Sequence, residues 1–284
     1  MLWPFEYYRP ETASEVDRLL NENSGARILA GGSNLVIDME YDLARPDCII
    51  DIKKVDVANE FTIKEDGLST IGAAIPINRL MDCSDVSWGC IKDAVPMVAS
   101  YQVRNRATTV GNFVNGSPAA DMAPPCMVLG TTVNIRKSDG TTRQSPLDTF
   151  FKGVKKVDLQ ENEWVTSIEI ASHSKSCKSG FYKKQRVNGH DLAIINVAAL
   201  CDPEQGQLRF CVGACAVTPL FFDFDDVYKE AKAKGAEGKE AMKSAGLDKI
   251  MNTISPISDV RASAEYRREL VKYYVTKLID EIYS

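Results

Sequence analysis

Apolar and polar residues at the start of the chain alternate in short blocks that are typical of a small α/β unit. Thr12-Ala13-Ser14-Glu15 has the spacing of a capping box, which predicts the start of a helix. Two brief apolar runs next to turn residues predict buried strands. In chain order we expect a helix from Thr12 to about Asn23, a strand at Arg27–Ala30, a short helix around Leu35–Glu40 and a strand at Cys48–Ile52.

The middle of the chain mixes strand and helix patterns. Phe61–Lys64 and Leu68–Ile71 predict a hairpin around Glu65-Asp66-Gly67. Helices are expected at Pro76–Met81, from Asp85 to about Tyr101, and at Met122–Leu129. Strands are expected at Thr131–Arg136, which precedes an Asp139-Gly140 turn, and at Glu163–Ile170. The small polar residues 171–178 predict a linker.

Beyond the linker, the pattern predicts a meander of three strands followed by helices. The strands are expected at Phe181–Gln185, Leu192–Leu200 and Gln207–Val217. The composition turns helical from Asp225, and Arg261–Ile282 carries an apolar stripe that predicts a long helix lying on the sheet. We therefore expect an α+β protein with a first domain at residues 1–174, split into about 1–57 and 58–174, and a second at 175–284.

Two segments fit neither an ordinary core strand nor an amphipathic helix. The longer segment runs from Arg104 through Gly111-Asn112 and Ser117–Asp121 to Pro124-Pro125, and it is dominated by small, turn-forming and amide residues. The shorter segment, Gly31-Gly32-Ser33-Asn34, follows an apolar run. Backbone N–H groups in such loops are free to bind an anion, and small side chains let it come close. Together the two segments suggest a bound polyphosphate.

Known phosphate-binding motifs do not explain these loops. Neither matches Gly-x-Gly-x-x-Gly or Gly-x₄-Gly-Lys-Ser/Thr, so a Rossmann site and a P-loop are both disfavoured. Taken alone, Gly31-Gly32 is more often a plain turn after a strand.

Charge and hydropathy narrow the class of protein. The net charge of −5 over 284 residues argues against a nucleic-acid partner, which would favour a basic face. No apolar run approaches the roughly 18–20 residues of a membrane helix, and the first ten residues lack the pattern of a signal peptide. We expect a cytoplasmic protein without a membrane partner.

The cysteines give no metal motif. None of the eight forms Cys-x-x-Cys, and no tight iron–sulfur spacing occurs, so we expect buried apolar thiols. Cys211 and Cys215 could share one face of a strand, which makes them the best candidate metal pair. With only His173 and His190 in the chain, a histidine-rich centre is disfavoured, and we assign no metal ligands.

The ordered set of motifs resembles the FAD-binding subunit of molybdenum hydroxylases, a family that includes the flavin subunits of xanthine, nicotinate and carbon monoxide dehydrogenases. The resemblance covers essentially the whole chain. It rests on Leu29–Leu35, Gln102–Asn105, Gly111-Asn112 with Ser117–Asp121, Ile168-Glu169-Ile170, Lys183 with Asp191-Leu192-Ala193, and Pro256–Ser263 leading into Tyr266-Arg267. It implies a PCMH-type FAD-binding domain of two subdomains, followed by an antiparallel sheet with helices like the carbon monoxide dehydrogenase flavoprotein C-terminal domain.

The resemblance also implies a set of FAD-binding residues. The first diphosphate loop is Ile28, Leu29, Ala30, Gly31, Gly32, Ser33, Asn34 and Leu35, and the second is Thr108, Thr109, Val110, Gly111 and Asn112, acting through backbone amides and the Thr108 hydroxyl. Asp121 is expected toward the adenosine half of FAD, Val165 in the strand that lines the flavin, and Lys183 near the isoalloxazine ring. The alternative for Lys183 is a solvated strand lysine. Asp191 completes the set, with a simpler role as a strand-start residue that orients Arg186 or Lys183 as its alternative.

Val110 departs from the family's pattern, which has Gly-Gly-Asn where this chain has Val110-Gly111-Asn112. If the first glycine is needed for a positive φ, valine costs roughly 1–3 kcal/mol and shifts the loop. If glycine is there only for closeness, Val110 can point away at little cost, and we favour this second case. FAD binding could still be weakened or altered.

The function that the resemblance implies is electron transfer within a complex. A large molybdopterin subunit and a small 2Fe-2S subunit are the expected partners, with NAD⁺ or another molecule as the electron acceptor. The chain agrees in lacking cluster cysteines, a molybdenum ligand and a nucleophile–base pair. The alternatives are a stand-alone flavin oxidoreductase of related fold and a flavin-free assembly subunit, the latter motivated by Val110.

Overall fold

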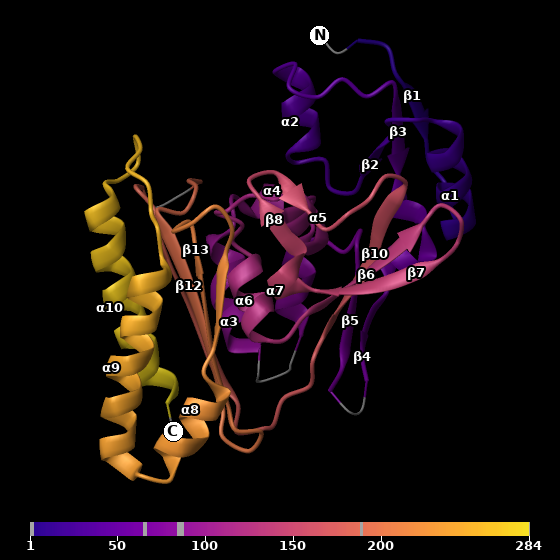
Figure 1. Ribbon diagram of the computed structural model, residues 1–284. Helices are drawn as coiled ribbons and strands as arrows, with labels where there is room; N and C mark the ends of the chain where they lie inside the picture. The colour runs from indigo at the N-terminus through magenta and orange to yellow at the C-terminus, as the bar shows by residue number, and fades with distance from the viewer. Residues whose placement is uncertain (1–2, 65–66, 84–87, 188–189, 284) are drawn as a thin grey trace.

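The computed structural model describes residues 3–64, 67–83, 88–187 and 190–283 (Figure 1). Its first unit is a small parallel sheet with strand order β1-β3-β2, in which β3 (Cys48–Asp51) is fully buried. The other two strands are β1 (Glu6–Tyr8) and β2 (Arg27–Leu29), and the helices are α1 (Ala13–Glu22) and α2 (Leu35–Glu40). The predicted capping box of α1 is confirmed. Strand β1 was not predicted, because a short, largely exposed strand leaves no apolar pattern.

A second, antiparallel sheet follows, with strand order β4-β5-β10-β6-β7. Its central strand, β10 (Glu163–Ile170), is almost entirely buried, as its apolar pattern predicts. The outer strands are β4 (Phe61–Ile63), β5 (Ser69–Gly72), β6 (Thr132–Lys137) and β7 (Thr142–Pro146). The predicted β4–β5 hairpin is confirmed, although Glu65 and Asp66 of its turn lie outside the described residues.

Short helices lie before, between and after these strands along the chain. They are η1 (Ile52–Lys54), η2 (Asp56–Asn59), η3 (Ile77–Asp82), α3 (Gly89–Ala94), η5 (Val95–Met97), α4 (Tyr101–Arg104), α5 (Thr109–Val114), α6 (Ala123–Val128) and α7 (Leu147–Phe150), and a two-stranded piece pairs β8 (Phe151–Gly153) with β9 (Lys156–Val157).

The prediction of one continuous helix from Asp85 to about Tyr101 is wrong. Asp85 itself lies outside the described residues, but α3, η5 and α4 divide the rest. Pro96 has no backbone N–H to continue the helix, and Ala99 adopts a left-handed φ of 39°. The apolar spacing of Val95 and Val98 reflects burial in the core, not one helical face.

The C-terminal part is an antiparallel sheet with strand order β11-β12-β13-β14. Its strands are β11 (Lys178–Lys184), β12 (Ile195–Asp202), β13 (Gln207–Gly213) and β14 (Leu220–Asp223), and its helices are α8 (Asp225–Lys232), α9 (Gly235–Thr253) and α10 (Ala264–Ile282). The predicted third strand was too long, because the chain turns at Ala214, with φ 60°, and returns as β14. The predicted linker is also one residue too long, since β11 begins at Lys178.

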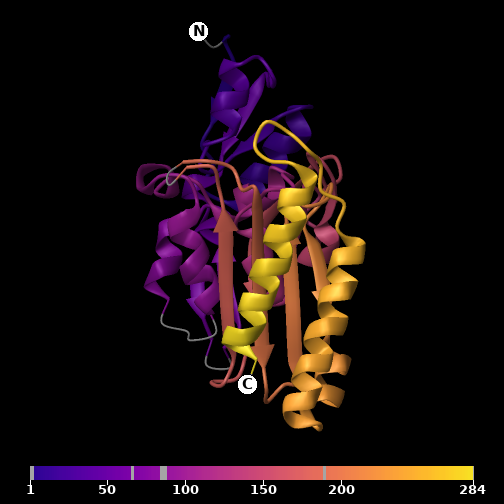
Figure 2. The ribbon, with the colours of Figure 1, turned by 90° about the vertical axis from the view of Figure 1, so that its left-hand side faces the viewer.

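Helices cover both faces of this sheet (Figure 2). Helices α8 and α10 pack on the outer face, whereas α3 and α6 from the N-terminal part pack on the inner face (Figure 1). The strand residues alternate accordingly: Ala198 and Leu200 belong to the core with the N-terminal part, and Val197 and Ala199 to the core with the C-terminal helices. The expected α+β fold class is therefore confirmed, and the two parts share one buried sheet.

Among the described residues, no helix combines the length and the apolar character needed to cross a membrane.

Candidate cofactor site

The first glycine loop links β2 to α2 and presents backbone donors. Gly32 adopts a φ of +75°, which glycine alone adopts without strain. Within the described chain, the N–H groups of Gly31, Gly32, Ser33 and Asn34 have no hydrogen-bond acceptor. Unpaired N–H groups in a half-exposed loop can bind an anion.

The two predicted loops lie against each other. A Cβ atom at Gly31 would lie 2.0 Å from the carbonyl oxygen of Arg106 and 2.8 Å from the Cα atom of Ala107. No side chain fits in such a contact, so only glycine lets the backbones touch. Because Ala107 directly precedes Thr108–Asn112, this contact brings the first loop next to the start of the second.

The second loop is the first turn of a short helix, which corrects the expectation that no helix forms here. Thr108 is the N-cap of α5, and its hydroxyl oxygen accepts a hydrogen bond from the Gly111 N–H at 2.9 Å. The Thr108 hydroxyl thereby closes the turn, while its own hydrogen remains available as a donor. The hydroxyl oxygen of Thr109 is buried without a partner among the described residues, so this segment still has an unused polar group.

Asn112 joins the second loop to the segment that follows it. Its side-chain oxygen accepts a hydrogen bond from the Met122 N–H at 3.1 Å. This contact holds α5 against the turn that carries Asp121, and it leaves the Asn112 amide group as a donor.

Val110 is accommodated without strain. It lies within α5, it is absent from the residues with positive φ, and only 4% of it is exposed because it belongs to the apolar core. The case in which a left-handed backbone is required at this position is therefore contradicted, and the valine side chain points away from the loop surface.

A network that sequence reasoning missed supports the first loop. The Lys53 ammonium donates to the Ala30 carbonyl oxygen at 3.1 Å and pairs with Asp51 at 2.7 Å. The Tyr7 hydroxyl also donates to Asp51, which is only 2% exposed. Burial alone would raise the pKa of Asp51, but the hydrogen bonds from Lys53 and Tyr7 outweigh it and hold the pKa below its usual value. The network depends on β1, which left no sequence signal.

Asp121 and Lys183 form a buried ion pair. The Lys183 Nζ lies 2.7 Å from Asp121 Oδ2 and also donates to the Met97 carbonyl oxygen at 2.9 Å, while the Asn196 amide donates to Asp121 Oδ1 at 3.1 Å. Burial raises the pKa of Asp121 although Lys183 and Asn196 oppose the shift. Lys183 is only 7% exposed, so the alternative of a solvated strand lysine is wrong.

This ion pair bears on the separate roles expected for the two side chains, which remain predictions. The resemblance implied Asp121 at the adenosine half and Lys183 at the isoalloxazine ring, which are opposite ends of the cofactor. Because their charged atoms are in contact, the two residues occupy one place and act as a unit.

Val165 and Asp191 have local structural explanations. Val165 is 5% exposed and lies in β10 beside an irregularity in the pairing with β6. Asp191 precedes β12, and its carboxylate pairs with Arg186 Nε at 3.0 Å and accepts from the Leu192 N–H. Of the two partners considered for Asp191, the structure thus has Arg186, because Lys183 is held by Asp121.

All eight cysteines are buried, as expected. Cys211 and Cys215 do not share a face, because Cys211 faces the core with the N-terminal part and Cys215 the core with the C-terminal helices. The candidate metal pair is therefore wrong, since β13 ends at Gly213 before Cys215 is reached.

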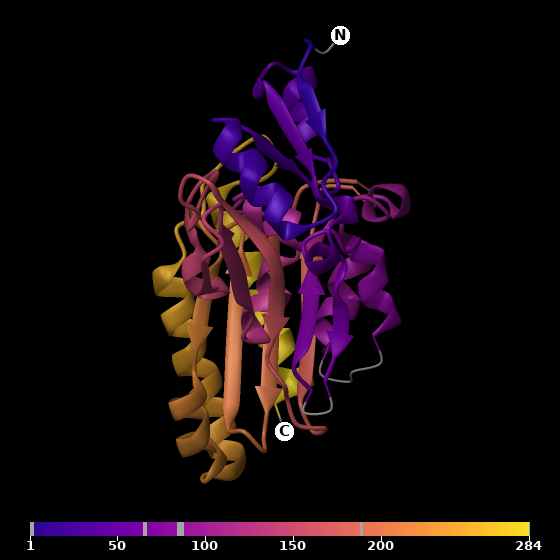
Figure 3. The ribbon, with the colours of Figure 1, turned by 90° about the vertical axis from the view of Figure 1, so that its right-hand side faces the viewer.

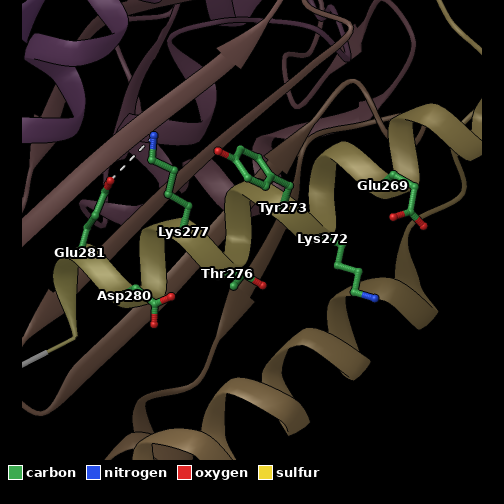
Figure 4. Close-up of a pocket in the computed structure, with 7 residues that line it drawn as sticks. All are labelled: Glu269, Lys272, Tyr273, Thr276, Lys277, Asp280 and Glu281. Carbon is green, nitrogen blue, oxygen red and sulfur yellow. Dashed lines mark ion pairs between the residues drawn. The ribbon is translucent and has the colours of Figure 1, made fainter.

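A hollow of about 610 Å³ runs along the exposed side of α10 (Figure 4). Its lining is mostly charged and comes from α10 alone: Glu269, Lys272, Tyr273, Thr276, Lys277, Asp280 and Glu281. It lies on the outer face of the C-terminal part, whereas the glycine loops lie in the N-terminal part, so the two are separate (Figure 1).

The glycine loops fit the diphosphate of a dinucleotide. Neutral backbone N–H groups satisfy phosphate oxygens without basic side chains. The Gly31 contact and the unused Thr109 hydroxyl are features that a plain turn does not require.

Comparison with known proteins agrees with this reading. The model of the FAD binding domain in molybdopterin dehydrogenase matches residues 3–172, and that of the CO dehydrogenase flavoprotein C-terminal domain matches residues 180–282. The xanthine dehydrogenase FAD-binding subunit of Escherichia coli is 28% identical over 281 residues, which cover 97% of this chain and 94% of the relative. The glyceraldehyde dehydrogenase medium chain of Sulfolobus acidocaldarius is 29% identical over an alignment of 291 positions, which covers 98% of each chain.

The fold agrees as well. In the solved structure of reconstituted CO dehydrogenase from Oligotropha carboxidovorans, a chain superposes with a TM-score of 0.87 at 22% identity, over 99% of this chain and 98% of that one. The resemblance drawn from the sequence motifs is therefore confirmed. This chain belongs to the family that carries the FAD-binding domain of molybdopterin dehydrogenases, and the cofactor of the family is FAD.

Proposed function

We propose that this chain is the electron-transfer subunit of a molybdenum hydroxylase complex similar to xanthine dehydrogenase. The observation that carries the proposal is the contact of Gly31 with the Arg106–Ala107 peptide, because it brings the first donor-rich loop against the start of the second. When bound, FAD would supply the redox chemistry by which the complex would carry electrons from iron–sulfur clusters of a partner subunit to NAD⁺ or another acceptor.

The chain's own contribution begins with binding the diphosphate. We assign this role to the loops Ile28–Leu35 and Thr108–Asn112, through those backbone N–H groups that have no acceptor within the chain. The unpaired N–H groups of Gly31–Asn34 support the first assignment, and the N-cap geometry of Thr108 supports the second. The Lys53 bond to the Ala30 carbonyl keeps this oxygen occupied, so that the loop offers donors to an anion.

The buried unit of Asp121, Lys183 and Asn196 is assigned to positioning near the cofactor. Its ion pair joins the N-terminal part to β11 and β12, because Asp121 precedes α6 whereas Lys183 and Asn196 lie on the C-terminal sheet. A paired lysine exerts a weaker field than a lone one, so we expect a modest effect on the cofactor's potential. Val165 and Asp191 stay in the proposed set as residues that shape the surroundings.

The partners are proposed to be a molybdopterin-containing large subunit and a small 2Fe-2S subunit. Support comes from the names of the relatives, which are a subunit and a medium chain of larger enzymes. The burial of all eight thiols in the core agrees, because iron–sulfur clusters need cysteine ligands in close groups. The domain division at residues 1–174 and 175–284 and the cytoplasmic location remain predictions.

Purification of the chain with its partners tests the proposal. We expect a flavin absorption spectrum and about one FAD per chain released on denaturation. A colourless complex that releases no FAD would overturn the proposal and would leave the flavin-free assembly subunit. If the chain without partners were reduced by a small substrate, a stand-alone oxidoreductase would replace the electron-transfer role. The structure removes the motive for the flavin-free reading, because Val110 is buried without strain.

A further inference from the structure

The segment between β10 and β11 brings three potential metal ligands together. His173 and Cys177 lie in this segment, and Asp202 is the last residue of β12. One ligand atom from each, a ring nitrogen, the thiol sulfur and a carboxylate oxygen, lie within 4.8 Å of one another. The side chains of His173 and Asp202 are 1% and 0% exposed, and Cys177 is 5% exposed. We propose that His173, Cys177 and Asp202 form a binding site for a divalent ion of the zinc class.

The orientation of His173 suits a metal ligand. Its Nε2 lies 3.2 Å from the Leu129 carbonyl oxygen, and because a carbonyl only accepts, Nε2 carries the hydrogen. The lone pair of a neutral imidazole is then on Nδ1, which lies 3.7 Å from Asp202 Oδ2. Metal-binding histidines commonly donate their other N–H to a backbone carbonyl in this way, which fixes the ring.

Both oxygens of the Asp202 side chain accept hydrogen bonds, as those of a carboxylate do. Its Oδ1 accepts from the Ser174 hydroxyl and from the N–H groups of Glu204 and Gln205, and its Oδ2 accepts from the Ser174 N–H at 2.8 Å. A buried negative charge favours a nearby cation, either an imidazolium or a metal ion.

The presence of Cys177 favours the metal ion over the imidazolium. An imidazolium–carboxylate pair has no use for a thiol, whereas zinc is bound by cysteine, histidine and carboxylate ligands together. Three protein ligands leave one tetrahedral position for water or another donor. On binding, the thiol releases its proton to solvent and the sulfur becomes the ligand.

The location gives the ion a structural role. Leu129 is the C-cap of α6 in the N-terminal part, His173 and Cys177 belong to the connection, and Asp202 belongs to the C-terminal sheet. An ion at this point would fasten the connection to both parts. The proposed metal site does not depend on the proposed function, because metal binding is measured without FAD chemistry or turnover.

Metal binding by the full chain tests the site. The chain is stripped with a chelator and then titrated with Zn²⁺ in competition with a chromophoric chelator, and Co²⁺ is used to detect thiolate coordination by its charge-transfer absorption. We expect one ion per chain. Loss of a residue that only supports a ligand lowers metal affinity by up to about 100-fold, so loss of the ligand itself in Cys177→Ala should lower it by at least about 100-fold. Cys48→Ala, which removes a buried thiol in β3, is the matched control and should bind as the wild type does.

Folding of each variant is checked by circular dichroism, and His173→Gln replaces Cys177→Ala if the latter does not fold. Wild-type protein that takes up no stoichiometric metal would overturn the proposal, as would equal affinity in the wild type and the ligand variant. A Co²⁺ complex without thiolate absorption would also contradict it, because Cys177 would then not be a ligand.

Discussion

Lys53 is the residue on which the first glycine loop most visibly depends. Its ammonium joins the Ala30 carbonyl oxygen to the buried Asp51 carboxylate, so a single side chain links the loop to the end of β3. The next lysine in the chain, Lys54, instead pairs with Glu11 at the surface. Two adjacent lysines thus have different roles, because their tertiary contacts differ.

We predict that Lys53→Met weakens FAD binding. The Ala30 carbonyl oxygen loses its donor and Asp51 loses its counter-charge, so the loop shifts and the dissociation constant for FAD rises about tenfold, or about 1.4 kcal/mol. Titration of FAD-free protein, followed by quenching of flavin fluorescence, measures the constant. Lys54→Met serves as the control, and equal affinity in the two variants would remove Lys53 from the account.

The second prediction concerns Lys183. Lys183→Met leaves Asp121 buried with only Asn196 as donor, which should lower the free energy of unfolding by about 3–5 kcal/mol. Urea unfolding measures this change, with Lys184→Met as the control on the same strand. The double variant Asp121→Asn/Lys183→Met should recover much of the loss, because no buried charge remains. A single variant as stable as the wild type would refute the buried pair.

At the scale of elements, the structure explains the family motif that leads into α10. Arg267 is 1% exposed, and its guanidinium donates to Asp259 Oδ1 at 2.8 Å and to the Ile194 carbonyl oxygen. The arginine therefore ties α10 both to its own preceding turn and to the approach of β12. The outer helix layer of Figure 2 is anchored at this point.

We predict that Asp259→Asn loosens α10. The buried Arg267 loses its counter-charge, which should lower the free energy of unfolding by about 3 kcal/mol. This value is at the low end of the range for breaking a buried pair, because Arg267 still donates to the Ile194 carbonyl oxygen. Burial would raise the pKa of Asp259, but hydrogen bonds from Arg261 and Arg267 hold it well below the usual value.

The pH dependence of this variant has a definite sign. A depressed folded-state pKa gives stability that is complete above the unfolded-state pKa, about 3.9, and is lost as pH falls below it. The difference in stability between the wild type and Asp259→Asn should therefore be constant near neutral pH and shrink below about pH 4. Thermal unfolding at several pH values measures it. A difference that grows on acidification would contradict the assigned pair.

Local signals predicted the elements that depend on local contacts. The Thr12–Glu15 capping box specified α1, and the apolar run of Glu163–Ile170 specified the central strand β10. Strand β1 was not predicted because its burial is slight. The helix predicted through Tyr101 is interrupted at Pro96 and Ala99. For the site, glycine and amide residues marked both loops, but the Gly31–Arg106 contact and the Lys53 network are tertiary and have no sequence pattern.

For the whole molecule, the C-terminal sheet is shared between the two parts (Figure 3). Its inner face, with Ala198, Leu200 and Cys211, packs in the same core as residues of α3 and α6. A sheet with both faces covered by helices loses half of its packing when one layer is removed. The two parts are therefore separate along the chain but share one hydrophobic core.

We predict that a fragment of residues 175–284 does not fold cooperatively by itself. Its inner apolar face would be exposed, so we expect binding of a hydrophobic dye, and a broad thermal transition or aggregation. The full chain, in contrast, should unfold in one cooperative transition. Calorimetry and dye fluorescence compare the two, and a monomeric fragment with a sharp transition and no dye binding would contradict the shared core.

The most direct test of the account is the affinity for FAD of Gly31→Ala. A methyl group at Gly31 would lie 2.0 Å from the Arg106 carbonyl oxygen, so the two loops must separate, and we predict at least a tenfold rise, about 1.4 kcal/mol, in the dissociation constant. Gly25→Ala is the control, because Gly25 has a φ of +78° but no neighbour within 4 Å, so it should cost stability and leave FAD affinity unchanged. Wild-type affinity in Gly31→Ala would contradict the claim that the two glycine loops form one cofactor site.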